Sequence, residues 1–299
     1  MKLRLSLFAP LAAGLLLSSC ATGPATGSAA APPPSAAEVR AATGRGLVTR
    51  YADAVVEVEV VTTIKITVGN RTVPRELRYQ PNGTVLSPSG LTLTSLSAID
   101  PEASVQAAAN GVPQRVQVND VEFKEVKLRL ADGTEIPARV VLKDPDQDLA
   151  FIAPLPDAAA AKRIFPCADL SNPAAAEVLG GYYVIARAAK VLQRAPVVRE
   201  ITIEGIAEKP RRLFLVNQVL LGCPLFDPQG RLLGVALAHI ANGRPNGAIV
   251  MPAQAIEQGA KLAAEAAAKP AAGAADADDS AAAPAAPPSA GASGQQAPP

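Results

Sequence analysis

Residues 126–152 read VKLRLADGTEIPARVVLKDPDQDLAFI, and this stretch decides the fold class. Residues 126–130 and 135–142 are two short segments rich in Val, Leu and Ile, which is typical of strands. Between them lies Asp132-Gly133, a dipeptide that favours a two-residue β-hairpin turn. A further apolar run begins at Asp148. The stretch therefore predicts three consecutive antiparallel strands.

Short strand patterns continue on both sides of this stretch. Upstream, Val55–Val68 is rich in β-branched residues, and Asn82-Gly83 opens a second hairpin that returns through residues 91–94. Only Pro252–Lys269 has the pattern of a long helix. Downstream, further apolar runs are separated by turn-forming residues, at 184–188, 197–203, 212–216, 224–226, 232–238 and 248–251. About a dozen short strands indicate an all-β protein, either a sandwich or a pair of barrels.

The composition excludes several classes of function. The 28 basic and 27 acidic residues leave a formal net charge of +1. A protein held to nucleic acid by phosphate contacts would need a basic excess, so no nucleic-acid partner is expected. One histidine and three cysteines are too few for a zinc cluster of the usual spacing. The sequence therefore predicts no metal site and no cofactor.

The first 20 residues, MKLRLSLFAPLAAGLLLSSC, have the features of a secretory signal. Lys2 and Arg4 precede an apolar run that is too short for a permanent transmembrane helix. The run ends in residues 17–20, LSSC, which resemble the lipobox of bacterial lipoproteins. The resemblance implies cleavage before Cys20 and acyl chains on its sulfur and new amino group, which together would anchor the protein stably in a membrane. The alternative is an ordinary secretory signal with a chance cysteine.

The chain divides by composition into four parts. They are a lipoprotein signal peptide (1–19), a lipidated cysteine with an Ala/Pro-rich tether (20–40), a folded domain (41–268) and an Ala/Pro-rich tail (269–299). Tether and tail cannot bury enough apolar surface to fold, so both are predicted to be disordered. In bacteria with two membranes, the small residue Ala21 after the lipobox implies sorting to the outer membrane, facing the periplasm.

Four segments of the folded part, in order, resemble the trypsin-like serine protease domain of the HtrA (DegP) type. They are residues 83–100, 126–152, 219–235 and 247–256. The second segment is the closest match, and its Asp148 falls on the aspartate of the family's catalytic triad. The resemblance implies two six-stranded antiparallel β-barrels, as in chymotrypsin and trypsin, followed by a short C-terminal helix.

The same resemblance puts unsuitable residues at the other catalytic positions. Ser97 stands at the position of the triad histidine, and Leu221 stands at that of the nucleophilic serine. Val219 replaces a glycine whose N–H group serves the oxyanion hole. Leucine has no nucleophilic atom, serine is no base near neutral pH, and a β-branched residue resists the backbone conformation that glycine permits. The sequence therefore predicts a pseudoprotease in which no catalytic set is intact.

Two polar residues have structural alternatives to a catalytic role. Asp148 could be a carboxylate that accepts backbone N–H groups near the barrel interface, and it could also bond Ser97. His239 is the single histidine and lies well after the nucleophile position. It is expected to be a surface or half-buried residue.

Cys167 and Cys223 remain once Cys20 is lipidated. In an oxidising cell envelope they could form a disulfide, or they could be two separate buried thiols. Cys223 lies two residues beyond the nucleophile position, so it is also the sharpest candidate for a replacement nucleophile.

These observations favour a catalytically inactive, HtrA-like lipoprotein of the cell envelope. Its expected role is to bind a polypeptide or an envelope protein, because a protease cleft holds extended chains without needing the triad. The alternatives are an active peptidase with unconventional residues and a structural envelope lipoprotein. The sequence leaves the partner and the oligomeric state open, with an oligomer among the alternatives.

Overall fold

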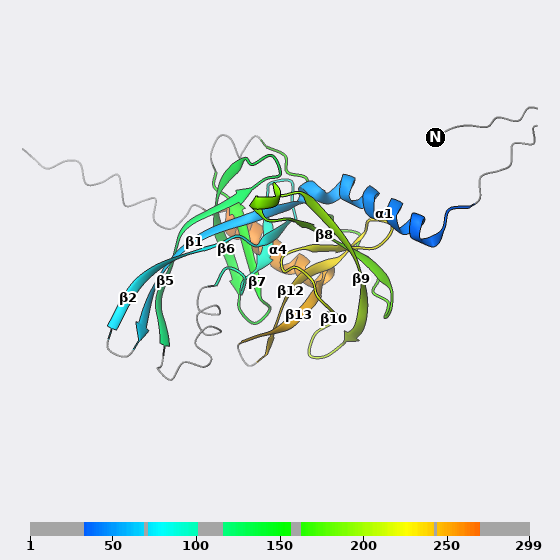
Figure 1. Cartoon of the computed structure of the whole chain (residues 1–299). Helices are drawn as coiled ribbons and strands as arrows, with labels where there is room; N and C mark the ends of the chain where they lie inside the picture. The colour runs from blue at the N-terminus through cyan, green and yellow to red at the C-terminus, as the bar shows by residue number, and fades with distance from the viewer. Residues whose placement is uncertain (1–32, 69–70, 101–115, 157–162, 242–243, 270–299) are drawn as a thin grey trace, which may run out of the picture.

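The computed structural model describes residues 33–68, 71–100, 116–156, 163–241 and 244–269. Figure 1 shows the course of the chain, which contains two long helices and thirteen strands within these ranges. The elements are α1 (Ala36–Tyr51), β1 (Val55–Val68), β2 (Arg71–Tyr79), β3 (Asn82–Val85), β4 (Thr92–Ser95), β5 (Val116–Arg129), β6 (Glu135–Asp144), β7 (Leu149–Pro154), β8 (Gly181–Arg187), β9 (Pro196–Ala207), β10 (Leu213–Val216), β11 (Pro224–Phe226), β12 (Leu232–Ala241), β13 (Arg244–Pro252) and α4 (Ala253–Ala268).

Six antiparallel strands close the first barrel. Going round it, the order is β1, β3, β4, β7, β6 and β5, and β5 pairs with β1 again. The strand β2 pairs with the outer part of β1, so β2, β1 and β5 extend together beyond the barrel (Figure 1). The interior is filled by aliphatic side chains such as Val58, Leu128 and Ile152.

The second barrel is also closed and antiparallel, with the strand order β10, β13, β12, β11, β8 and β9. Its interior contains Ile203, Leu225 and Leu233, which are fully buried. Both barrels are thus built from Val, Leu and Ile, as a chain with 3% aromatic residues requires.

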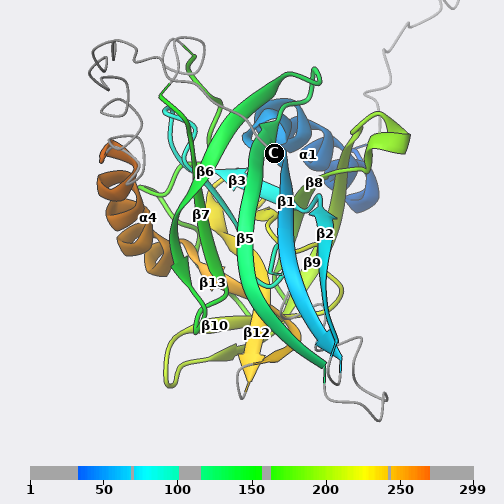
Figure 2. The same ribbon diagram turned by 90° about the vertical axis from the view of Figure 1, so that its left-hand side faces the viewer.

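An apolar cluster shared by both barrels holds them together. Leu93 and Phe151 come from the first barrel, and Leu237 and Met251 come from the second. The helix α4 covers this junction with residues such as Ile256 and contacts β6 and β7 as well as β12 and β13 (Figure 2). The predicted fold, two six-stranded barrels with a C-terminal helix, is confirmed.

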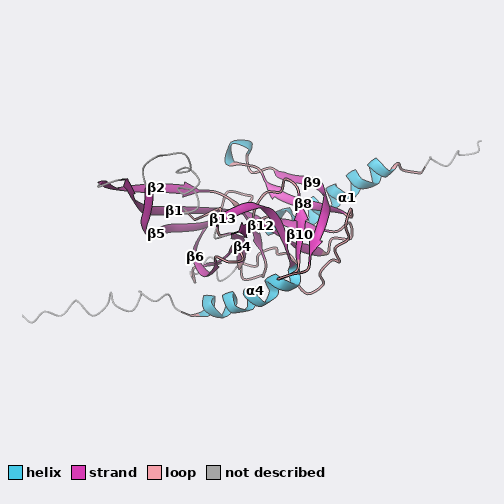
Figure 3. Ribbon diagram, turned by 90° about the horizontal axis from the view of Figure 1, so that it is seen from below, coloured by secondary structure: helices cyan, strands magenta, loops and turns pink. Residues whose placement is uncertain are grey.

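The helix α1 differs from the sequence prediction, which placed a disordered tether up to residue 40. The structure puts residues 36–40 in α1, because a capping box starts the helix there. The Ser35 hydroxyl accepts the N–H of Glu38 at 3.3 Å, and the Glu38 carboxylate accepts the N–H of Ser35 at 2.6 Å. Leu47 is buried and Gly44 lies against Tyr183, so α1 packs beside β8 and β9, away from α4 (Figure 3).

The predicted signal peptide, the lipobox with Cys20 and the tail beyond Lys269 lie outside the described residues. Among the helices that the structure does describe, none has the length and apolar character needed to cross a bilayer.

Candidate functional site

Asp148 lies at the junction of the two barrels. Its φ of +59° is in the left-handed region, which aspartate tolerates better than most side chains do. Its side chain is almost completely buried, and both carboxylate oxygens accept hydrogen bonds. The Ser97 N–H donates to Oδ1 at 2.7 Å, and the Ala238 N–H donates to Oδ2 at 2.7 Å. The Ser95 hydroxyl donates to Oδ2 as well.

These contacts match the structural alternative for Asp148, a carboxylate that accepts backbone N–H groups and contacts Ser97. Ser97 and Ser95 belong to the end of β4 and the turn after it, in the first barrel, whereas Ala238 belongs to β12, in the second. Asp148 therefore links the two barrels directly. Ser95 was not predicted as a site residue. No local pattern marks it, because its partner Asp148 is distant in the chain.

The loop that leads into β11 carries Leu221, and it is fixed against the first barrel through Gly222. The Thr84 hydroxyl donates to the Gly222 carbonyl at 2.8 Å. A Cβ atom on Gly222 would lie 1.9 Å from the Asn82 carbonyl oxygen and 3.0 Å from the Thr94 hydroxyl oxygen. Since Thr94 directly precedes Ser95, the loop reaches the same strand that contacts Asp148. The structure thus joins Ser97 to Asp148 and packs the loop that carries Leu221 against the strand that contains Ser95.

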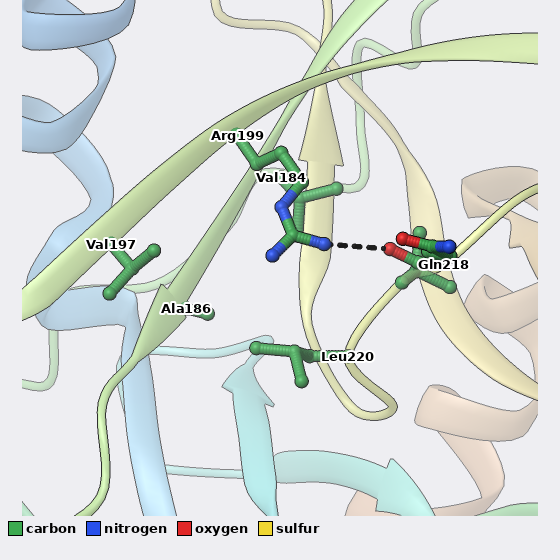
Figure 4. A pocket seen from close by; sticks show the side chains of 7 residues that line it. Val184, Ala186, Val197, Arg199, Gln218 and Leu220 are labelled. Atoms are coloured by element: carbon green, nitrogen blue, oxygen red, sulfur yellow. Dashed lines mark hydrogen bonds between the residues drawn. The ribbon is translucent and has the colours of Figure 1, made fainter.

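Part of the surface of this loop is apolar. Leu220 is 48% exposed, and Val219, at the predicted oxyanion position, is half-buried. With Val184, Ala186 and Val197 they line a water-sized hollow of about 20 Å³ (Figure 4). The Arg199 guanidinium donates to the Gln218 carbonyl at 3.1 Å at the border of this hollow (Figure 4).

The two remaining cysteines do not form the disulfide that the sequence left open. Both thiols are free, because Cys167 packs against the core of the first barrel while Cys223 lies in the core of the second. Burial raises the pKa of both thiols, and the Asp169 carboxylate adds to the effect at Cys167. A raised pKa keeps a thiol protonated, so neither cysteine is prepared to act as a nucleophile.

A groove of about 120 Å³ opens beside Ala238, with walls from both barrels. His239 lies in this groove and is half-buried, within the range that the sequence predicted. The remaining walls come from the β6–β7 turn, the β9–β10 loop and neighbouring strands: Asp146, Gln147, Pro210, Arg211, Leu213, Ala238, Ile240, Ile249 and Met251. Sequence reasoning missed this groove, because its residues come from four separate segments.

The strand β12 has an open edge next to the groove. On one side, β12 pairs with β13 as far as Ala241. On the other side it pairs with β11 up to Val235, and no strand pairs with residues 238–241 there in the part of the chain that the structure describes. An open strand edge beside a groove can add an extended peptide as a further strand. Within the same described ranges, no group of three His, Cys, Asp or Glu residues could hold a metal ion.

Two solved structures and one family model are similar to this chain. A crystal structure of Deg5 is 19% identical, covers 73% of this chain and 92% of its own, and has a TM-score of 0.49. The MamO protease domain from Magnetospirillum magneticum, in its apo form, is 17% identical, covers 70% of this chain and 97% of its own, and has a TM-score of 0.42. No curated protein sequence matches the chain significantly. A family model described as a trypsin-like peptidase domain matches residues 82–235, just over half of the chain, and the match contains both Asp148 and Leu221. The chain therefore belongs to the family of trypsin-like peptidase domains.

Proposed function

We propose that this protein is a catalytically inactive, HtrA-like member of the family that holds an extended polypeptide at the edge of β12. One observation carries the proposal. An open strand edge and a groove lie at Ala238, whose N–H group is bonded to Asp148, while the residue that falls on the family's nucleophile position is the apolar Leu221. The groove serves binding, and binding does not need the triad.

The inactivity rests on the groups around the interface. Leu221 offers no nucleophilic atom, and the hydroxyl of Ser95 is buried and bonded to Asp148. Cys223, the replacement nucleophile considered above, is fully buried and its raised pKa keeps it protonated. His239 lies in the groove, but a general base without a nucleophile beside it cannot start acyl transfer. Loss of the nucleophile alone typically lowers turnover by about six orders of magnitude.

The groove indicates what kind of segment would bind. Its floor is apolar, with Leu213, Ile249 and Met251, whereas Asp146 and Arg211 lie exposed at its border. We expect a bound polypeptide to pair its backbone with the edge of β12 and to place an aliphatic side chain on this floor.

We further propose that the protein is a lipoprotein anchored through Cys20 in the outer membrane, facing the periplasm. The lipobox supports this, and α1 begins at Ala36, so about 15 residues would separate the anchor from the folded part. Such a length spans at most ~50 Å, which keeps the barrels near the membrane surface. In cells fed a labelled fatty acid, the wild-type chain should carry the label and Cys20→Ser should not. Label retained by Cys20→Ser would contradict the anchor.

Two assays on the full chain test the binding function. The first measures hydrolysis of unfolded casein beside Asp148→Asn, and we expect no turnover above that of the variant. The second selects peptides from a random library on the immobilised protein, and we expect enriched sequences with a central aliphatic residue. Turnover that the variant loses would establish the active peptidase instead. A library without enrichment would favour the structural lipoprotein and overturn the binding role.

A matched pair of variants locates the binding. Ile240→Arg places a long charged side chain in the groove and should weaken binding of a selected peptide at least tenfold. Leu215→Arg makes the same kind of change on β10, at a residue that is 44% exposed and does not line the groove. It should bind like the wild type. Circular dichroism of both variants verifies that the fold is kept.

A further inference from the structure

The Oδ2 atom of Asp148, which faces the Ser95 hydroxyl, has no lone pair left for a further hydrogen bond. Each carboxylate oxygen offers two lone pairs. Oδ2 accepts both the Ser95 hydroxyl and the Ala238 N–H, so its two lone pairs are in use. Ser95 is fully buried and Ala238 nearly so, which excludes water as a competitor for these bonds.

The hydroxyl groups form a directed chain. The Oγ atoms of Ser95 and Ser97 are 3.1 Å apart, at hydrogen-bond distance. Because Ser95 gives its only proton to Asp148, Ser97 must be the donor to Ser95. The polar groups at the former histidine position are therefore ordered from Ser97 through Ser95 to Asp148.

In a working triad, the aspartate accepts the Nδ1–H of the histidine and so holds the imidazole in its active orientation. We propose that the Ser95 hydroxyl occupies the acceptor site on Oδ2 of Asp148 that a histidine at position 97 would need for its Nδ1–H group. Asp148 thereby acts as a positioning residue, since it clamps Ala238, the first residue of the open β12 edge, to the first barrel. The inference concerns this contact alone and holds whether or not a peptide binds in the groove.

The first test compares two variants, Ser97→His and Ser97→His with Ser95→Ala. The pKa of the introduced imidazole is measured by NMR titration, with His239, the chain's single native histidine, as an internal reference. The same charged groups surround the imidazole in both variants, so the difference reports the contact with Asp148. We expect the double variant to have the higher pKa by about one unit or more, because only there is the Oδ2 atom of Asp148 free to accept an N–H group of the imidazolium. Equal values would overturn the proposal.

The second test follows amide hydrogen exchange in Asp148→Asn. Asparagine also tolerates the left-handed backbone, but its side chain has only one accepting oxygen. The N–H of Ser97 or that of Ala238 must therefore face the side-chain NH₂ group, which cannot accept it. We expect exchange at one of these two amides to rise about tenfold or more, relative to a core amide such as that of Leu233. Unchanged protection at both would contradict the clamp.

Asp227→Asn is the matched control for this exchange experiment. Asp227 is also buried and accepts the backbone N–H groups of Gln229 and Arg231, at 3.0 and 2.8 Å, but it lies in the β11–β12 turn, away from Asp148. It should leave the Ser97 and Ala238 amides unchanged. Should Asp148→Asn fail to fold, the imidazole titration still decides, since neither of its variants removes the carboxylate.

Discussion

Asp148 with its bonded neighbours (the Asp148 corner) and the loop that carries Leu221 (the Leu221 loop) both lie where the two barrels meet. They differ in burial and in hydrogen bonding. At the corner, Asp148 is buried and bonded to groups of both barrels. In the loop, Leu220 is exposed while the neighbouring Gly222 is packed tightly against β3 and β4. The residues that join the barrels are thus buried and hydrogen-bonded, whereas the loop presents an apolar side chain to solvent.

The two regions also differ in how many hydrogen bonds a substitution would break. A buried carboxylate with three donors is costly to remove, because the donors would be left without an acceptor. The side chains of Leu220 and Leu221, by contrast, have no polar partner to satisfy, so we expect their replacement to cost the fold little. The two regions therefore contribute differently to the interface, through polar bonds at Asp148 and through apolar surface in the loop.

The largest effect should come from Gly222→Ala. The added Cβ would meet the Asn82 carbonyl oxygen at 1.9 Å, and the φ of +78° strains any residue with a Cβ. We expect a loss of about 3 kcal/mol or more in the free energy of unfolding, measured by urea denaturation.

Gly133→Ala is the control for this prediction. Its φ is +85°, but a Cβ there meets nothing within 4 Å. It should therefore cost only the backbone strain, about 1 kcal/mol. Similar losses in both variants would show that Gly222 is not retained for packing against the first barrel.

A smaller effect is expected from Thr84→Val, which keeps the shape of a buried side chain and removes its hydroxyl. The Gly222 carbonyl then loses the donor that holds the loop to β3. The free energy of unfolding should fall by about 1–2 kcal/mol, as measured by thermal denaturation. A variant as stable as the wild type would mean that the loop is held without this bond.

The smallest effect is expected from Leu220→Ser. Because this side chain is 48% exposed, the free energy of unfolding should change by no more than about 0.5 kcal/mol. The melting temperature should accordingly stay close to that of the wild type. A large loss would remove the contrast between the corner and the loop, since the loop would then also serve the fold.

Two elements escaped prediction for identifiable reasons. The helix α1 continues an Ala-rich stretch and contains Gly44 and Gly46, which disfavour helices. The one signal that could have found it is the capping box at Ser35 and Glu38. The strand β2 has mostly exposed residues and includes Pro74, so it shows no alternation and resembles a loop in sequence.

The candidate site was predicted in part. The positions of Asp148, Ser97 and Leu221 followed from a resemblance spread over separate segments, and the structure shows Ser97 bonded to Asp148 and Gly222, the neighbour of Leu221, packed against β3 and β4. Ser95 and the groove around His239 could not be predicted, because each depends on contacts between segments far apart in the chain. The same limit applied to Cys167 and Cys223, whose separation into two cores became visible only in the fold.

The sequence by itself determined most of the strands, the turns and the absence of a nucleophilic atom in the side chain at position 221, because apolar patterning, turn chemistry and side-chain type are local properties. Only the tertiary structure decided how the two barrels meet, which edge of β12 stays open and which donor satisfies Asp148. The physical reason is that a buried carboxylate takes whatever donors the packing brings within reach. Here packing brought a serine from 53 residues away.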